Sequence, residues 1–502
     1  MSHILLYPVL LPLLTGSLAL MAYKSRVTQR WISLIGATLL FIASGWLLAT
    51  VHGGNIQVMQ LGNWPAPFGI TLVADTFSSL MVFITGLMGF TVALYGLGDV
   101  DDERESFGFH SFFQILILGV NGAFLTGDLF NLYVWFEVML ITSFVLLALG
   151  NGKAQLDGAV KYVVINLMSS LFFLAGVAIM YSLTGTLNMA EMAVRLGEVE
   201  QTGLITTASI FFLISFGIKS AIFPLFFWLP ASYHTPPVTV MALFAALLTK
   251  VGVYSLIRVF SLLFTQDIGY THTILLWLSV PTMVVGVLGA AAQYDVRKIL
   301  SFHIISQIGY MIMGLAFFTP LAIAGVIYYI LHNILAKTNL FLLAGVGQKL
   351  VGSYQLSKLG GLYKSYPLVS ILFVISAFSL AGMPPLTGFW AKYTVILAGL
   401  EIGEWVVIGF ALAVGLLTLF SMTKIWMGSY WSPLPDDAPV VADPNFKPAT
   451  GWTYAVLLAP IILVAACIVV LGLYGEPFFA MLFQGAEEIL NPQLYIEAVL
   501  NP

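Results

Sequence analysis

Residues 127–147 read GDLFNLYVWFEVMLITSFVLL, and this run decides the fold class of the chain. Apart from Asp128 at its front edge, Glu137 is its only charged residue and lies about halfway along it. The run has the roughly 20 apolar residues that a helix needs to cross a bilayer. An ionisable group near the bilayer midplane costs at least ~3 kcal/mol, so Glu137 predicts a functional site whose partners lie elsewhere in the chain.

Similar apolar runs recur from one end of the chain to the other. The 502 residues are 60% hydrophobic and only 8% charged, whereas roughly a quarter of a typical soluble domain is charged. Hydropathy predicts an all-α polytopic membrane protein of about fourteen transmembrane helices. The predicted spans are 3–22, 31–51, 71–98, 110–126, 128–149, 158–184, 203–228, 236–264, 272–293, 299–318, 321–348, 366–398, 403–428 and 452–474.

The composition excludes several classes of site and partner. A net charge of -4 favours neither a nucleic-acid partner nor a basic domain on the membrane surface. The single cysteine, Cys467, excludes an internal disulfide and an iron–sulfur cluster ligated by this chain alone. No Gly-rich phosphate loop and no metal-ligand spacing occur in the sequence. We therefore expect no cofactor, no metal and no enzymatic activity. The first run lacks a basic n-region and a cleavage site, which predicts a retained helix.

The basic residues predict the orientation in the membrane. With the N-terminus outside, only Arg195 and Arg258 of the 19 Lys and Arg residues fall on the outer side, and four lysines lie within spans. The remaining basic residues fall on the cytoplasmic side: Lys24, Arg26, Arg30, Arg104, Lys153, Lys161, Arg297, Lys298, Lys349, Lys358, Lys364, Lys424 and Lys447. This bias follows the positive-inside rule and predicts that both termini lie outside.

Three polar segments connect or follow the spans. The acidic segment 99–105 is interpreted as a solvated cytoplasmic turn. Residues 432–450 contain five prolines and three aspartates, which is typical of a linker, here placed before an isolated last helix. The tail 476–502 is mixed apolar and acidic, and we expect a short helix there on the outer surface.

Two spans are interrupted by proline, which removes a backbone donor and clashes with the preceding turn. Pro224 interrupts the seventh span, and Pro384 and Pro385 interrupt the twelfth. Paired broken helices in two halves of a chain are a signature of transporter sites. The breaks lie five spans apart, and an odd-numbered unit repeated in tandem has its second copy inverted. The predicted divisions are 1–109 (helices 1–3), 110–264 (first five-helix repeat), 265–428 (inverted repeat) and 429–502 (linker, helix 14 and outer tail).

Four lysines lie inside spans and are the candidate partners of Glu137. Lys219 comes just before the first break and is its natural pair, because a lysine alternating between apolar and carboxylate surroundings accepts and releases a proton. Lys250 lies too deep to extend its amine to the interface, and Lys392 follows the second break near the outer end, as a terminal relay would. Lys337 lies in the eleventh span.

The histidines are weaker candidates. His332 lies about 140° around the helix from Lys337. Two interpretations of His332 stay open: a protonation switch between Lys250 and Lys337, or a histidine satisfied within the core. His234 and His303 lie near cytoplasmic span ends and are interpreted as interfacial, although they could feed protons inward.

Four segments resemble a known family, the proton-translocating membrane subunits shared by respiratory complex I and the Mrp antiporters. The resemblance covers nearly the whole chain, and its motifs are specific. Within the family, the surroundings of Glu137 and the turn at 233–237 look most like the D-type subunits of Mrp sodium/proton antiporters. The segments are GDLFNLYVWFE (127–137), WLPASYHTPP (228–237), LLTKVGV (247–253) and SFHIISQIGY (301–310).

The resemblance implies which residues are functional. The family's Glu of span five falls on Glu137, and its lysines of spans seven, eight and twelve fall on Lys219, Lys250 and Lys392. It also implies a hetero-oligomer in the bacterial plasma membrane, with protons and Na⁺ as the transported ions and no redox cofactor in this subunit. The chain lacks the long lateral helix of the largest complex I subunit.

Three hypotheses for the function follow. The first is an antiporter subunit that relays protons while the complex exports Na⁺. The second is a proton-pumping subunit of a complex I-type dehydrogenase or membrane hydrogenase, which genes for Cys-rich cluster proteins beside this one would favour. The third is a scaffold that transports nothing, for which Lys219→Ala would leave activity and assembly intact.

Overall fold

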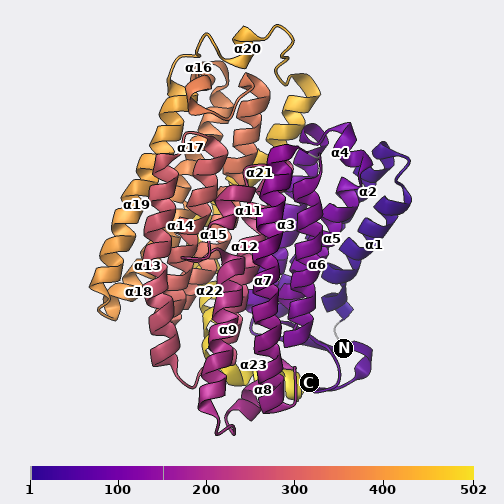
Figure 1. Cartoon of the computed structure of the whole chain (residues 1–502), viewed down its shortest axis with the longest axis vertical. Helices are drawn as coiled ribbons and strands as arrows, with labels where there is room; N and C mark the ends of the chain where they lie inside the picture. Colours follow the sequence, from indigo (N-terminus) through magenta and orange to yellow (C-terminus); the bar gives the residue numbers. More distant parts are fainter. Residues whose placement is uncertain (1–2, 151, 502) are drawn as a thin grey trace.

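The computed structural model describes residues 3–150 and 152–501 as one bundle of long, roughly parallel helices (Figure 1). Twelve helices are long and apolar enough to cross a membrane, and α5 and α17 are shorter apolar helices. The all-α membrane architecture is thereby confirmed. Counting from the N-terminus, the larger helices are α1 (Tyr7–Met21, after the 3-10 turn η1, His3–Leu6), α2 (Arg26–Val51), α3 (Thr76–Asp99), α5 (Phe109–Leu125), α6 (Leu129–Ala148), α7 (Lys153–Thr184), α9 (Thr202–Ser220), α11 (Val238–Ala246), α12 (Leu248–Leu262), α13 (Ile268–Ala292), α14 (Val296–Phe317), α15 (Pro320–Val351), α17 (Pro367–Ala381), α18 (Thr387–Glu401), α19 (Trp405–Ile425, continued by the π turn η4, Trp426–Trp431) and α21 (Gly451–Leu473).

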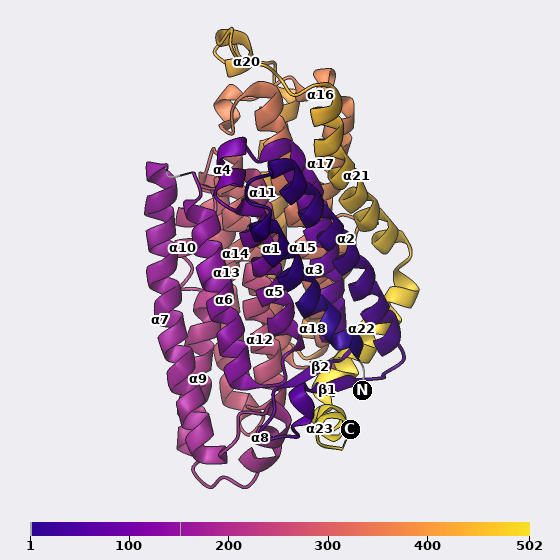
Figure 2. The ribbon, with the colours of Figure 1, turned by 90° about the vertical axis from the view of Figure 1, so that its right-hand side faces the viewer.

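Short helices mark the two ends of the bundle. At one end lie α4 (Asp102–Ser106), α16 (Leu362–Ser365) and α20 (Pro439–Ala442), and at the other lie α8 (Met189–Leu196) and α23 (Pro492–Leu500) (Figure 1). Both ends of the described chain lie near α23, at the same end of the bundle (Figures 1 and 2). This agrees with the prediction that both termini lie on one side of the membrane. The terminal residues 1, 2 and 502 lie outside the described part of the chain.

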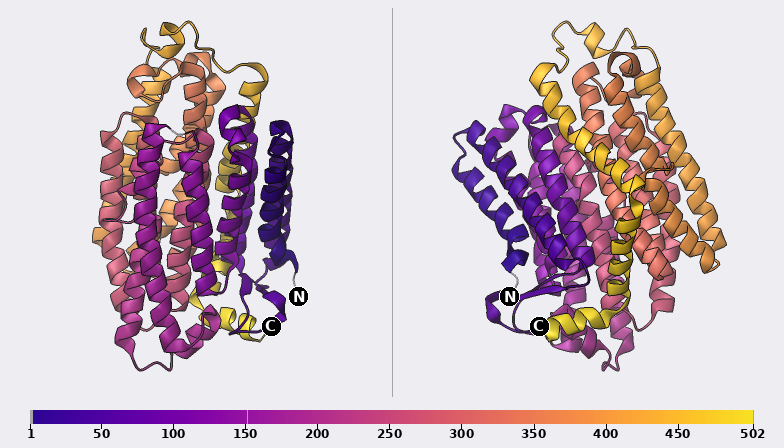
Figure 3. Two further views of the ribbon diagram at one scale, coloured as in Figure 1. Left: turned by 45° about the vertical axis from the view of Figure 1, so that its right-hand side comes forward. Right: turned by 180° about the vertical axis from the view of Figure 1, so that it is seen from behind.

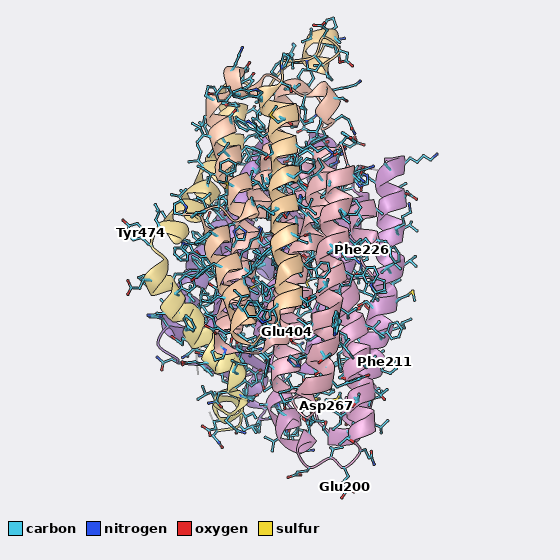
Figure 4. All side chains as sticks on the ribbon, turned by 90° about the vertical axis from the view of Figure 1, so that its left-hand side faces the viewer. Glu200, Phe211, Phe226, Asp267, Glu404 and Tyr474 are labelled. Carbon is cyan, nitrogen blue, oxygen red and sulfur yellow. The ribbon has the colours of Figure 1, made fainter. Side chains whose placement is uncertain are left out.

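Both predicted helix breaks are present. Between α9 and α10 (Trp228–Ser232), Ala221 has a φ of 60°, and Phe226 of this segment lies near mid-height of the molecule (Figure 4). Between α17 and α18, Gly382 has a φ of 92°. A third break, at Leu247 between α11 and α12, was not predicted. The inverted-repeat relation between the two halves stays a prediction.

The start of the third predicted span is wrong. Residues Thr71–Ala74 form strand β2, which pairs antiparallel with β1 (Gln57–Gln60), and the helix begins only at Thr76. Asp75 caps α3 by accepting a hydrogen bond from the Ser78 backbone amide at 2.8 Å. A side-chain acceptor at this position fixes where a helix begins. The apolar residues of β2 are buried, which is why hydropathy alone did not separate them from the span.

The C-terminal region is packed into the bundle, contrary to the isolated helix and surface tail predicted for it. Helix α21 contacts α3, α15 and α17, and the C-terminal helices run over the bundle in the rear view of Figure 3. Tyr474, after α21, lies only at mid-height (Figure 4). Helix α22 (Gly475–Leu490) then continues along α3 and α15. It buries Leu482, Ala486 and Ile489 on one face. This amphipathic face pairs with residues far away in sequence, so no local pattern identified its partner.

The acidic segment 99–105 is not simply a solvated turn. Glu105 is fully buried; its Oε1 accepts a hydrogen bond from Arg30 Nε at 2.7 Å and lies 3.2 Å from His110 Nε2. Asp99 accepts the backbone amide of Thr239 at 3.0 Å and so caps α11. At the end of the bundle opposite the termini, Glu105 thus ties α2 to α5, and Asp99 ties the end of α3 to the start of α11.

The innermost helices are α11, α12, α14 and α15, which are buried almost throughout, whereas α2, α7, α13 and α19 expose apolar side chains outward. Apolar side chains on an outer helix face are stable against lipid or a partner subunit. Lys250 and Lys337 lie on the innermost helices, which places two of the candidate residues in the centre of the bundle.

Gly388→Ala is expected to prevent folding of the second half of the bundle. A Cβ atom on Gly388 would lie 1.7 Å from the backbone oxygen of Ser379 and 2.7 Å from His332 Cε1. Neither the backbone nor the fully buried ring can move far enough to relieve these clashes without a large loss of stability. We expect little or no assembled protein on a native gel. Gly409→Ala, on α19, is the matched control because a Cβ there meets nothing within 4 Å. Normal amounts of Gly388→Ala would contradict the packing at this break.

Candidate functional site

Glu137 lies on α6 and is held by α7. Its side chain is half-buried, and Ser170 Oγ donates a hydrogen bond to Oε1 of the carboxylate. The same hydroxyl lies 3.2 Å from the backbone oxygen of Asn166, one turn earlier on α7. The carboxylate is therefore fixed in position between the two helices.

Lys219 lies at the point where α9 breaks off. It is the penultimate residue of that helix, whose carbonyl end carries a partial negative charge that favours a cation. Its Nζ lies 5.3 Å from the centroid of the Phe136 ring. Within the described residues, no carboxylate oxygen approaches this amine within 4.0 Å, yet Glu137 is close enough to interact with it electrostatically. The predicted pair is thus a near pair rather than a direct salt bridge.

A small cavity adjoins Lys219 and the helices that hold Glu137. Its volume is about 20 Å³. Tyr162, Asn166 and Trp228 line it together with Lys219 and Phe136. A water molecule needs roughly 10–15 Å³ of such space. The cavity is therefore large enough for one water molecule next to residues of α6, α7 and α9.

Lys250 lies directly after the unpredicted break in the next span. Its fully buried amine donates to the backbone oxygen of Ala245 at 2.5 Å, a carbonyl before the break at Leu247. Gly252 allows α12 to touch the end of α9, because a Cβ there would lie 2.9 Å from the backbone nitrogen of Ser220. Through this contact, the break that follows Lys219 lies next to the break that precedes Lys250.

Lys337 and His303 occupy the centre of the second half. Lys337 Nζ donates to the backbone oxygen of Leu300 at 3.3 Å, and both side chains are fully buried. His303 was predicted to be interfacial, and this is wrong. Neither of its ring nitrogens has a hydrogen-bond partner among the described residues. His303 lies on α14, which other helices surround almost completely, and a local hydropathy pattern does not show which helices are surrounded in this way.

His332 bridges the second break. Its Nδ1 lies 3.0 Å from Thr387 Oγ1 at the start of α18 and 3.3 Å from Ser379 Oγ near the end of α17. Lys392 and Lys337 both lie within electrostatic range of its ring. The predicted role of His332 as a switch between Lys250 and Lys337 stays a prediction.

Lys392 extends back across the second break. Its Nζ donates to the backbone oxygens of Ala381 at 2.9 Å and Leu380 at 3.1 Å, which are the last carbonyls of α17. Both Lys219 and Lys392 thus occupy the carbonyl end of a half-helix, although one precedes its break in sequence and the other follows it. Lys392 also lines a largely apolar cavity of about 600 Å³ between α18 and α19.

A buried ion pair that the sequence did not predict lies at the end of the bundle that carries the termini. Arg258, predicted only as an outer basic residue, lies on α12 and bonds Asp75 at the start of α3, with both side chains buried. Its Nη2 also lies 3.4 Å from Tyr254 Oη. Lys250, Tyr254 and Arg258 recur every four residues and so share one helix face. This four-residue spacing is the feature of the sequence that could have indicated a shared polar face on α12.

Comparison with known proteins identifies the family. A family model described as NADH:quinone oxidoreductase/Mrp antiporter, TM, matches residues 126–418. The chain is 47% identical to the D-type subunit of the Na(+)/H(+) antiporter of Alkalihalophilus pseudofirmus and 43% identical to that of Bacillus subtilis, with full coverage of both chains.

Solved structures agree with this similarity. A chain of the Mrp complex from Dietzia sp. DQ12-45-1b superimposes with a TM-score of 0.90 at 31% identity, and each chain covers 100% of the other. A chain of respiratory complex I from Thermus thermophilus gives a TM-score of 0.83 at 23% identity over 97% of this chain and 100% of that one, which shows a shared fold. The chain therefore belongs to the family of NADH:quinone oxidoreductase and Mrp antiporter transmembrane subunits.

Proposed function

We propose that this chain is the proton-translocating subunit of a multisubunit Na⁺/proton antiporter in a bacterial plasma membrane, with both termini outside. It works as a transporter subunit within a hetero-oligomeric complex, and it is not an enzyme. Protons pass along Glu137, Lys219, Lys250 and Lys392, with His332 and Lys337 as intermediate groups. The observation that carries this proposal is the placement of buried amines at successive helix breaks.

The order of these groups supports a relay across the bundle. Glu137 interacts with Lys219, the end of α9 touches α12 beside Lys250, and Lys337 lies within electrostatic range of both Lys250 and Lys392. Each amine donates to a backbone carbonyl or lies at a half-helix end. Among the described residues, none of the four has a carboxylate oxygen within 4.0 Å. An amine held in this way can release its proton to the next group.

Polar atoms between the lysines support a hydrated path. Ser220, Thr249, His303, Ser306, Gln307, His332, Asn333 and Asn339 each have a buried side-chain atom without a protein partner in the described part of the chain. Buried polar atoms in proteins are nearly always bonded to protein or to ordered water, because leaving one unsatisfied costs roughly 1–3 kcal/mol. Water bound to these atoms would connect the amines.

The alternative function, a proton pump in a redox complex, has weaker support. The similarity to complex I lies at 23% identity and concerns the fold alone. The curated relatives at 47% and 43% identity over the full length are named antiporter subunits. The genomic neighbours of this gene give an independent test: genes for small membrane proteins favour the antiporter, and genes for Cys-rich cluster proteins favour the pump.

Glu137→Gln is expected to stop Na⁺-dependent proton movement. The carboxamide retains an acceptor for Ser170 but carries no charge and takes up no proton in the physiological range. In everted vesicles, the Na⁺-induced decay of a pH gradient should fall by about a hundredfold or more, as expected for loss of a proton-transfer group. Native gels should show normal assembly.

Asp157→Asn is the matched control for this experiment. Asp157 lies on α7, the helix of Ser170, but is exposed and pairs only with Lys161 one turn away. Exposed pairs of this kind contribute little to stability. The antiport rate of Asp157→Asn should therefore equal that of the wild type. Wild-type antiport in Glu137→Gln would refute the relay.

A further inference from the structure

An open cleft at the outer end of the molecule is not used by the proposed relay. It has a volume of about 600 Å³ and lies between the loop that follows α2 and the two C-terminal helices, α22 and α23. Gly53, Asn55, Gln484, Glu488 and Ala498 are among its lining residues. Glu488 is buried although the cleft around it is open.

Glu488 connects this cleft to the start of α3. Its Oε2 accepts the backbone amide of Thr76 at 2.8 Å, and its Oε1 accepts the Thr76 hydroxyl at 2.8 Å. Gln484 Nε2 donates to the same carboxylate at 3.0 Å. The residue next to Thr76 is Asp75, the buried partner of Arg258. The carboxylate in the cleft and the buried ion pair are therefore adjacent.

From Asp75, a polar row continues inward along α12. Arg258 bonds both Asp75 and Tyr254, and Lys250 lies one further turn inward on the same face. Four residues of helix rise by about 6 Å, so the eight residues from Arg258 to Lys250 cover about 12 Å. This is a large part of the distance from the surface to the middle of a ~30 Å hydrocarbon layer. The row thus leads from the outer cleft to a lysine of the relay.

We propose that Glu488 takes up protons from the outer medium and passes them through Asp75 and water beside Tyr254 to Lys250, while Arg258 holds Asp75 in place and carries no proton. The uptake of outer protons then occurs at the C-terminal helices, in addition to any path at Lys392. In each cycle the Glu488 carboxylate accepts one proton from water in the cleft and becomes a neutral acid. It returns to the carboxylate when Asp75, or water beside Tyr254, accepts that proton. This inference rests on the relay proposed above.

The surroundings of Glu488 suit such a role. Burial raises the pKa of its carboxyl group, and the neighbouring Asp75 carboxylate raises it further. The other charged or titratable groups nearby are Arg258 of α12, Tyr495 of α23 and the exposed Glu487 of α22. A raised pKa keeps a larger fraction of Glu488 protonated at a given outer pH. A carboxylate that only capped α3 would need no open cleft.

The first test measures antiport against the pH of the outer side, which is the lumen of everted vesicles. In the wild type, the initial rate should fall as luminal pH rises through the pKa of Glu488. Glu488→Gln should lower the rate about tenfold or more and remove this dependence on luminal pH, while Glu488→Asp should retain it. Glu487→Gln, at the neighbouring exposed carboxylate, is the control and should match the wild type.

A second pair of variants covers the case in which Glu488→Gln fails to assemble. Ala498→Lys places a cation across the cleft without changing the hydrogen bonds of Glu488, and Ala498→Gln is its uncharged control. Because a nearby cation favours the carboxylate, the pH midpoint should move down by about one unit at low salt in Ala498→Lys only. An unshifted midpoint, or a wild-type profile in Glu488→Gln, overturns the proposal. Inactive Glu137→Gln together with normal Glu488→Gln would leave the relay standing and remove only this route.

Discussion

Lys219→Ala is expected to abolish Na⁺-dependent proton movement while the complex still assembles. The alanine removes the amine that interacts electrostatically with Glu137, and a water molecule in the adjoining cavity would then lose the basic group to which it could pass a proton. Lys219 makes no salt bridge within the described residues, so the alanine variant does not deprive any carboxylate of a salt-bridge partner. Assembly on native gels should therefore remain normal, and the Na⁺-induced signal in everted vesicles should fall to background.

Lys219→Arg separates a proton relay from a purely electrostatic role. An arginine keeps the positive charge near Glu137 but is never deprotonated in proteins. We expect this variant to be as inactive as the alanine variant. Lys161→Ala, which removes an exposed lysine on α7, is the control and should retain wild-type rates. Activity in Lys219→Arg alone would show that charge suffices, and activity in Lys219→Ala would favour the scaffold hypothesis.

The positions of the long helices could be predicted because membrane spans have one dominant physical requirement. An apolar segment of about 20 residues has few other stable structures in a bilayer. Proline likewise marked the breaks near Pro224 and Pro385. The break at Leu247 could not be found in this way, because its surroundings contain no proline and the interruption depends on packing against neighbouring helices.

The candidate residues could be named because charges are rare in apolar sequence, but their partners could not. Lys250, Lys337 and Lys392 all donate to backbone carbonyls, and every residue has a carbonyl, so no sequence pattern identifies these acceptors. The contact between Glu488 and Thr76 joins residues 412 positions apart. Such contacts are decided by tertiary packing, and the C-terminal helices were mispredicted for the same reason.

Arg258→Leu is expected to destabilise the protein strongly, because it breaks the buried ion pair with Asp75. The guanidinium bonds Asp75 and lies 5.6 Å and 5.2 Å from the ring centroids of Tyr254 and Tyr495, so it joins α12, α3 and α23. Removing one partner of a buried ion pair costs about 3–5 kcal/mol, because the other charge stays buried without compensation. The purified complex should show a thermal midpoint several degrees lower, measured by loss of the native gel band on heating.

The double variant Arg258→Leu/Asp75→Asn tests whether the stranded charge is the cause. An asparagine oxygen can still accept the Ser78 amide, so the cap of α3 is retained while the buried negative charge is removed. We therefore expect the double variant to be more stable than Arg258→Leu alone. Asp75→Ala in place of Asn should recover less, since it also loses the cap, worth about 1 kcal/mol. If both double variants were as unstable as the single one, the loss would come from the packing of the arginine against the two tyrosines and not from the charge on Asp75.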